Sequence, residues 1–166
     1  ATAGAWYSAK HSADAPPTNA SVWNSYNEYD AWAGFLAMLD PKFVAELLTT
    51  TQTVARNTVT DGGSYETVTS KMFLPSTTEV GLANENNIAE GTLLALFSND
   101  ASRVAYPTAP CVNNADGYTN SGFATSKGWY WWLRTPYSSY AGDVRSVSSD
   151  GSLNNYYAYN GLDGAR

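Results

Sequence analysis

The stretch that decides the fold is WYWWL, residues 129–133. A short, continuous run of large apolar side chains predicts a buried or half-buried strand. Successive side chains of a strand point to opposite faces, so at most one of Trp131 and Trp132 would be free to stack on a sugar ring. We expect both tryptophans to belong to the core.

The residues after this strand predict an antiparallel hairpin. Residues 144–147 and 153–159 are strand-like, and the Asp150-Gly151 pair between them is typical of a tight hairpin turn. Asn160-Gly161 predicts a second turn.

Two helices are predicted on the N-terminal side. The first spans residues 28–39, where Trp32, Phe35, Leu36 and Leu39 recur at i, i+3, i+4 and i+7. Asp40-Pro41 ends it, and Pro41 opens the second helix. The apolar face expected for this second helix consists of Phe43, Val44, Leu47 and Leu48.

The middle of the chain predicts a second hairpin and then mixed elements. Residues 49–59 are rich in Thr and Val, residues 64–74 are again strand-like, and Asp61-Gly62-Gly63 separates them as a turn. Ser76 with Glu79 has capping-box spacing, which favours a helix start. We expect a short helix over residues 88–97 and a long loop over residues 98–127.

These patterns predict an α+β fold with two N-terminal helices and a mixed or antiparallel sheet with long loops. Pro16-Pro17 prevents a helix near the start, so residues 1–25 are expected to form an extended lead-in. Residues 26–166 are expected to form a single domain.

The charge balance argues against two classes of partner. The formal net charge is -6, with only nine Lys and Arg, whereas nucleic acids and anionic membrane surfaces require a basic patch. No apolar run approaches the roughly 20 residues that cross a bilayer, so we expect no membrane insertion.

The usual catalytic side chains are scarce. His11 is the only histidine and Cys111 the only cysteine, which leaves almost no material for a catalytic triad, a metal site or a disulfide. We therefore predict no enzyme activity, no cofactor and no metal. Residues 84–87 could offer oxygen ligands to calcium, but a solvated turn is the better interpretation. A hydrolase with an unrecognised carboxylate pair stays an alternative, with these candidates: Glu66, Glu79, Glu85, Glu90, Asp116, Asp143, Asp150 and Asp163.

Two populations of residues alternate along the C-terminal part of the chain. One is typical of a scaffold: Pro136, Ala141, Val144, Val147, Gly151, Leu153, Ala158, Gly161 and Gly164. The other is almost wholly Tyr, Ser, Asn and Asp: Tyr137, Ser138, Ser139, Tyr140, Asp143, Ser146, Ser148, Asn154, Asn155, Tyr156, Tyr157, Tyr159 and Asn160. Antibody binding loops share this second composition, because Tyr gives a large rigid contact and Ser and Asn adapt their hydrogen bonds. Polar turns also contain these residues, so composition alone leaves both interpretations open. Mutation of adenines in AAC-type codons would produce the same residue set.

Several motifs resemble a bacterial and phage domain of unknown function with the signature WWLRSP…VR…SDGSL…GVRPAL. The matching segments here are WWLRTP (131–136), VR (144–145), SDGSL (149–153) and GAR (164–166), preceded by FLPS (73–76) and EVGL (79–82). Ala165 departs from the valine of that signature. The resemblance implies a C-type-lectin-like fold, related to formylglycine-generating enzymes, with a variable-type region over residues 131–166. Their activity is not implied, because it needs two cysteines and Cys111 is alone.

Some members of that family resemble the variable proteins of diversity-generating retroelements, in which a reverse transcriptase introduces errors at adenines near the 3′ end of the gene. The resemblance implies that the Tyr/Ser/Asn/Asp set varies, with Leu162 added. It implies a ligand-binding domain for a protein or glycan on a cell surface, carried on a phage virion or a bacterial cell surface. A fixed carbohydrate-binding, lectin-like domain is the other alternative.

Overall fold

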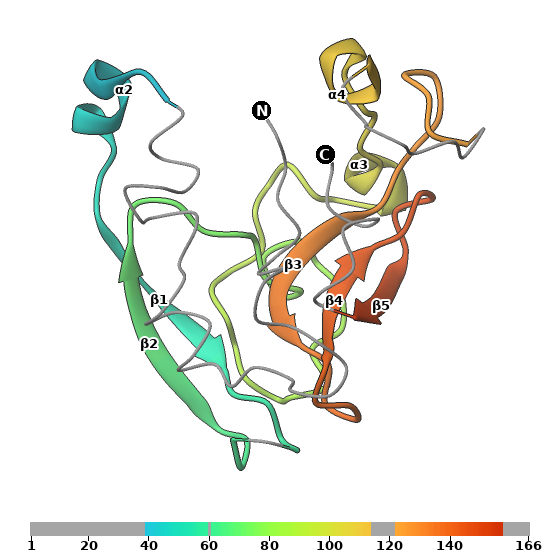
Figure 1. The fold of residues 1–166 in the computed structure, drawn as a ribbon. Helices are drawn as coiled ribbons and strands as arrows, with labels where there is room; N and C mark the ends of the chain where they lie inside the picture. The colour runs from blue at the N-terminus through green and yellow to red at the C-terminus, as the bar shows by residue number, and fades with distance from the viewer. Residues whose placement is uncertain (1–38, 60, 114–121, 158–166) are drawn as a thin grey trace.

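The computed structural model describes residues 39–59, 61–113 and 122–157, and these residues form short helices and two antiparallel sheets (Figure 1). The predicted α+β class is confirmed. The predicted lead-in, nearly all of the first predicted helix and the Asn160-Gly161 turn lie outside the described residues. No helix in the described ranges has both the length and the apolar character needed to cross a membrane.

Helix α2 spans Pro41–Glu46 and begins as predicted. Its N-cap is Asp40, whose side chain accepts a 2.8 Å hydrogen bond from the Lys42 amide, and Pro41 occupies the first turn. The predicted apolar face is wrong, because Leu47 is already extended and no residue of the helix is buried. Leu48, with 80% of its surface exposed, lies beyond the helix.

The hairpin predicted in the middle of the chain is confirmed, with shorter strands. Strand β1, Thr50–Ala55, pairs antiparallel with β2, Tyr65–Ser70. The connecting loop is closed by Asn57, whose carbonyl accepts from the amides of Asp61 (2.9 Å) and Gly63 (3.1 Å). Gly63 has a φ of 70°, which is the left-handed conformation that glycine adopts readily.

The second sheet is formed by the C-terminal part of the chain. Strands β3 (Trp131–Pro136), β4 (Asp143–Val147) and β5 (Leu153–Tyr157) lie in the order β3-β4-β5, all antiparallel. The predicted hairpin with Asp150-Gly151 at its turn is therefore confirmed. In Figure 1 the β1–β2 hairpin lies to the left of this sheet, and strands β1 and β3 contact each other.

The core confirms the expectation for both tryptophans. Trp132 is buried, and Trp131 packs against a buried cluster of Val80, Leu133 and Val147. The Trp131 ring stacks on Phe97 with a centroid distance of 5.9 Å, and its Nε1 donates to the Arg103 carbonyl at 2.9 Å. Neither ring is an exposed sugar platform.

The predicted helix over residues 88–97 is wrong. An α-helix would require the Leu94 amide to donate to the Glu90 carbonyl. That carbonyl instead accepts from the Ser76 hydroxyl (2.6 Å) and from Arg134 (2.9 Å), and Leu94 donates to the Glu79 carbonyl (2.9 Å). Long-range partners therefore hold this segment in an irregular conformation.

Two further predictions are corrected in detail. The capping box forms, since Ser76 and Glu79 exchange two hydrogen bonds of 3.0 Å, but it closes one turn and no helix follows. The predicted loop over residues 98–127 contains two short helices, α3 (Asp100–Arg103) and α4 (Ala109–Asn113). Asn99 caps α3 with its own capping box, a signal that the sequence analysis missed.

Candidate recognition surface

A buried arginine organises the region beneath the C-terminal sheet. Arg134 on β3 is 2% exposed and forms a two-pronged ion pair with Glu79, at 2.6 and 2.9 Å. The same guanidinium donates to the carbonyls of Leu74 (2.8 Å) and Glu90 (2.9 Å). This geometry suits a planar guanidinium, so Arg134 ties three chain segments together.

Glu90 completes this buried polar cluster, which we define as Arg134, Glu79, Glu90 and Thr135. The Glu90 side chain is fully buried and accepts hydrogen bonds from the Ala55 amide (2.8 Å), the Asn84 side chain (2.9 Å) and the Thr135 hydroxyl. Burial raises the pKa of Glu90, and these hydrogen bonds and Arg134 only partly oppose that effect. Glu79 and Glu90 are thus occupied in holding the fold, which speaks against their use as a hydrolytic pair.

A second arginine holds the turn between β4 and β5. Arg103 is buried at the end of α3, where it pairs with Asp100 and donates to the carbonyls of Gly151 (2.8 Å) and Val80 (3.1 Å). Gly151 has a φ of 88°, and a Cβ there would lie 1.9 Å from the Asp100 carbonyl oxygen. The turn therefore requires glycine.

The loop that joins β3 to β4, residues 137–142, is supported through its backbone. The Thr58 hydroxyl donates to the Ser138 carbonyl at 2.6 Å, and the Ser138 amide donates to Glu85 at 3.2 Å. The Asn57 side chain donates to the carbonyls of Tyr137 and Tyr140, each at 3.4 Å. These contacts do not depend on which side chains the loop carries.

Arg145 on β4 lies beside this loop. It forms an ion pair with Glu85 at 2.8 Å, donates to Asn155 at 3.3 Å, and lies 4.4 Å from the centre of the Tyr137 ring. Charge pairing and the cation–π contact hold the Tyr137 ring in place. The segment at residues 84–87 is therefore not a solvated turn: Asn84, Glu85 and Asn86 are half-buried and hydrogen-bonded.

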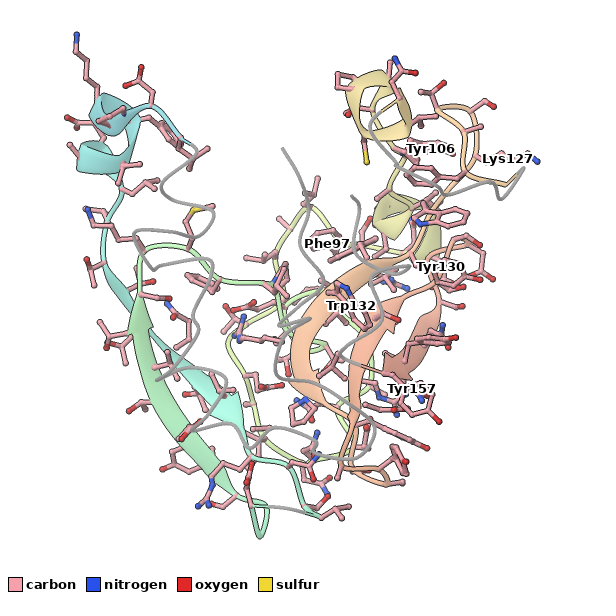
Figure 2. All side chains as sticks on the ribbon, viewed as in Figure 1. Phe97, Tyr106, Lys127, Tyr130, Trp132 and Tyr157 are labelled. Carbon is pink, nitrogen blue, oxygen red and sulfur yellow. The ribbon has the colours of Figure 1, made fainter. Side chains whose placement is uncertain are left out.

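Three tyrosines of the β3–β4 loop and strand β5 are exposed. Tyr140 is 46% exposed, and Tyr156 and Tyr157 are each 37% exposed. The Tyr157 ring meets Tyr140 edge-to-face at 5.9 Å and Tyr156 at 5.8 Å. Figure 2 labels Tyr157 at the β5 end of the C-terminal sheet. We call these three residues, together with the exposed Ser139, the tyrosine surface.

Asp143 lies next to the tyrosine surface. It is directly opposite Tyr157 in the β4–β5 pairing, so the two side chains share a face of the sheet. Its Oδ2 accepts a 2.8 Å hydrogen bond from Asn155, whereas its Oδ1 is buried without a hydrogen-bond partner. Burial raises the pKa of Asp143, and the bond from Asn155 and the charge of Arg145 oppose it.

The remaining predicted site residues differ in how far they are buried. The half-buried ones are Tyr137, Ser138, Asp143, Ser148, Asn154 and Asn155. Ser146 is fully buried, opposite Trp132 in the β3–β4 pairing, so it cannot be displayed. Ser146 shares a face of β4 with the buried Val144, a relation that composition alone does not reveal. The last three predicted positions lie outside the described residues: Tyr159, Asn160 and Leu162.

Four supporting residues were missed as parts of the site: Asn57, Thr58, Glu85 and Arg145. Thr58 and Ser138 are 80 positions apart in the chain, and Glu85 and Arg145 are 60 apart. No local pattern connects such residues. The sequence gives one signal: Arg145 belongs to the VR motif at residues 144–145, and Glu85 follows the EVGL motif at residues 79–82 and carries the opposite charge.

Comparison with known proteins identifies the family and nothing finer. No curated protein and no solved structure matches the chain. One family model matches residues 8–166, which is nearly the whole sequence. The chain therefore belongs to the family described as "Domain of unknown function (DUF6273)".

Proposed function

We propose that this protein is a ligand-binding domain, with a receptor-binding or adhesive role, that displays diversified side chains on a C-type-lectin-like scaffold. Its ligand is a protein or glycan on a cell surface, and the domain is carried on a phage virion or a bacterial cell surface. The proposal rests on the resemblance to variable proteins of diversity-generating retroelements and on the properties of the tyrosine surface.

One observation carries the proposal: the loop at residues 137–142 is held mainly through backbone atoms. Asn57, Thr58 and Glu85 contact carbonyl or amide groups of the loop and lie outside the predicted varied set. Side chains at Ser139 and Tyr140 can therefore change without loss of these supports. Diversified binding loops need this separation of support from display.

The distribution of burial gives a second line of support. Among the predicted scaffold residues, Pro136, Val144, Val147 and Gly151 are buried, whereas Ser139, Tyr140, Tyr156 and Tyr157 are exposed. Large exposed aromatic side chains on a rigid base are typical of protein-binding surfaces.

The test is deep sequencing of the 3′ end of the gene and its flanking DNA across the host population. We expect substitutions to concentrate at adenines in the codons for Ser139, Tyr140, Tyr156 and Tyr157, beside a near-identical template and a reverse-transcriptase gene. The codons for Trp131, Trp132, Val147 and Gly151 serve as the internal control and should stay unchanged. If both groups of codons varied equally, the proposal that this gene is diversified would be wrong.

A fixed carbohydrate-binding domain is the second candidate, because exposed tyrosine rings can also stack on sugars. A glycan array separates the two candidates. A single sharp specificity, shared by natural relatives and lost on Tyr140→Ala, would favour the fixed lectin-like domain.

A further inference from the structure

The positive charge beside the tyrosine surface is already neutralised within the protein. The Arg145 Nε and one terminal nitrogen contact Glu85 at 2.9 and 2.8 Å, and the other terminal nitrogen contacts Asn155 at 3.3 Å. The Tyr137 ring covers its face. Arg145 therefore has little left to offer a ligand.

The negative charge of Asp143, in contrast, has no ion-pair partner among the described residues. Only its Oδ2 is hydrogen-bonded, and a buried carboxylate oxygen without a donor is costly. A positively charged ligand group would match this unpaired carboxylate best, because charge-assisted hydrogen bonds are stronger than neutral ones.

Aromatic rings adjoin this carboxylate. Tyr157 is its direct cross-strand neighbour, and Tyr140 meets Tyr157 edge-to-face. Aromatic faces attract cations, most strongly where water is partly excluded. The net charge of -6 also favours approach by a basic partner.

We infer that the ligand of this surface is a protein segment that presents an arginine side chain, which packs on Tyr140 and Tyr157 and donates to Asp143. The inference rests on the proposed binding function and specifies the partner's chemistry. Arginine fits better than lysine, because a planar guanidinium stacks on a ring and donates to a carboxylate at the same time.

The probe is acetyl-arginine amide, titrated into the full-length ¹⁵N-labelled chain and followed by two-dimensional NMR. We expect saturable shifts at the Asn155 side-chain amide and at the backbone amides of Tyr140, Asp143 and Tyr157. Acetyl-citrulline amide, the neutral isostere, and methyl glucoside are the matched controls and should cause no such shifts.

Two variants test the contacts separately. Asp143→Asn should weaken arginine binding about tenfold, the effect expected for loss of one charge-assisted hydrogen bond. Tyr140→Leu keeps an apolar side chain without a ring face and should weaken it about threefold. Asp150→Asn, which removes a charge from the turn of the same hairpin, should bind as the wild type does.

Equal shifts with arginine and citrulline, or unchanged affinity in Asp143→Asn, would overturn the inference, as would saturable binding of the sugar alone. None of these results bears on whether the gene is diversified, which the sequencing experiment decides independently. The backbone amide cross-peaks of Val80, Leu133 and Val147 in the buried core report, when unchanged, that the fold is intact in each variant.

Discussion

The buried polar cluster and the tyrosine surface use similar chemistry for opposite purposes. In the cluster, Arg134 and Glu90 have partners in segments distant in sequence, and both are almost wholly buried. On the surface, Tyr140 and Tyr156 contact mainly other tyrosines and remain exposed. This protein therefore separates the residues that hold the fold from the residues that it displays.

The largest effect is expected from Arg134→Ala. The substitution removes the ion-pair partner of Glu79 and one of the two donors to the Glu90 carbonyl, so only Ser76 still donates to these two groups, and the loss should cost roughly 3–5 kcal/mol. Urea denaturation should show a large loss of unfolding free energy or no folded protein. A loss below 1 kcal/mol would mean that the cluster does not hold the fold.

The next effect is expected from Gly151→Ala. The new Cβ meets the Asp100 carbonyl at 1.9 Å with φ at 88°, so strain and displacement together should cost roughly 3 kcal/mol. Gly62→Ala is the matched control, because its φ is 72° but nothing lies within 4 Å of the added Cβ. It should cost only about 1 kcal/mol. Equal losses in thermal denaturation would show that the close approach of α3 does not matter.

A smaller effect concerns the dependence of stability on pH at Glu90. Because burial raises the folded-state pKa of Glu90 above its usual 4.5, the folded protein holds this proton at pH values where the unfolded chain has released it. The free energy of unfolding should therefore fall as pH rises from 4.5 to the folded-state pKa. Glu90→Gln cannot titrate and should show a flatter profile in that window. Parallel profiles would contradict the assigned pKa direction.

The smallest effect is expected on the tyrosine surface. Tyr140→Ser and Tyr156→Ser remove exposed rings and should change the unfolding free energy by no more than about 0.5 kcal/mol each. Ser146→Tyr, at a predicted site position that is buried, is the contrasting variant and should disrupt packing against β3. If Ser146→Tyr were equally harmless, burial would not separate displayed from supporting positions.

The sequence alone determined the features that depend on neighbouring residues. The Asp40-Pro41 helix start, both β-hairpins and the turn at Asp150-Gly151 follow from local backbone preferences, and the structure contains them. The core role of Trp131 and Trp132 followed from apolar content, and packing confirmed it. Part of the site was accessible in the same way, because the exposed tyrosines belong to the predicted Tyr/Ser/Asn set.

The tertiary structure decided everything that depends on distant partners. Residues 88–97 have helical composition, but Ser76 and Arg134 occupy the Glu90 carbonyl that a helix would need. Burial of Ser146 follows from strand pairing, and the support of the loop by Thr58 and Glu85 follows from contacts across the fold. The physical reason is that a buried polar group must find a partner wherever the chain provides one, and that search is not local.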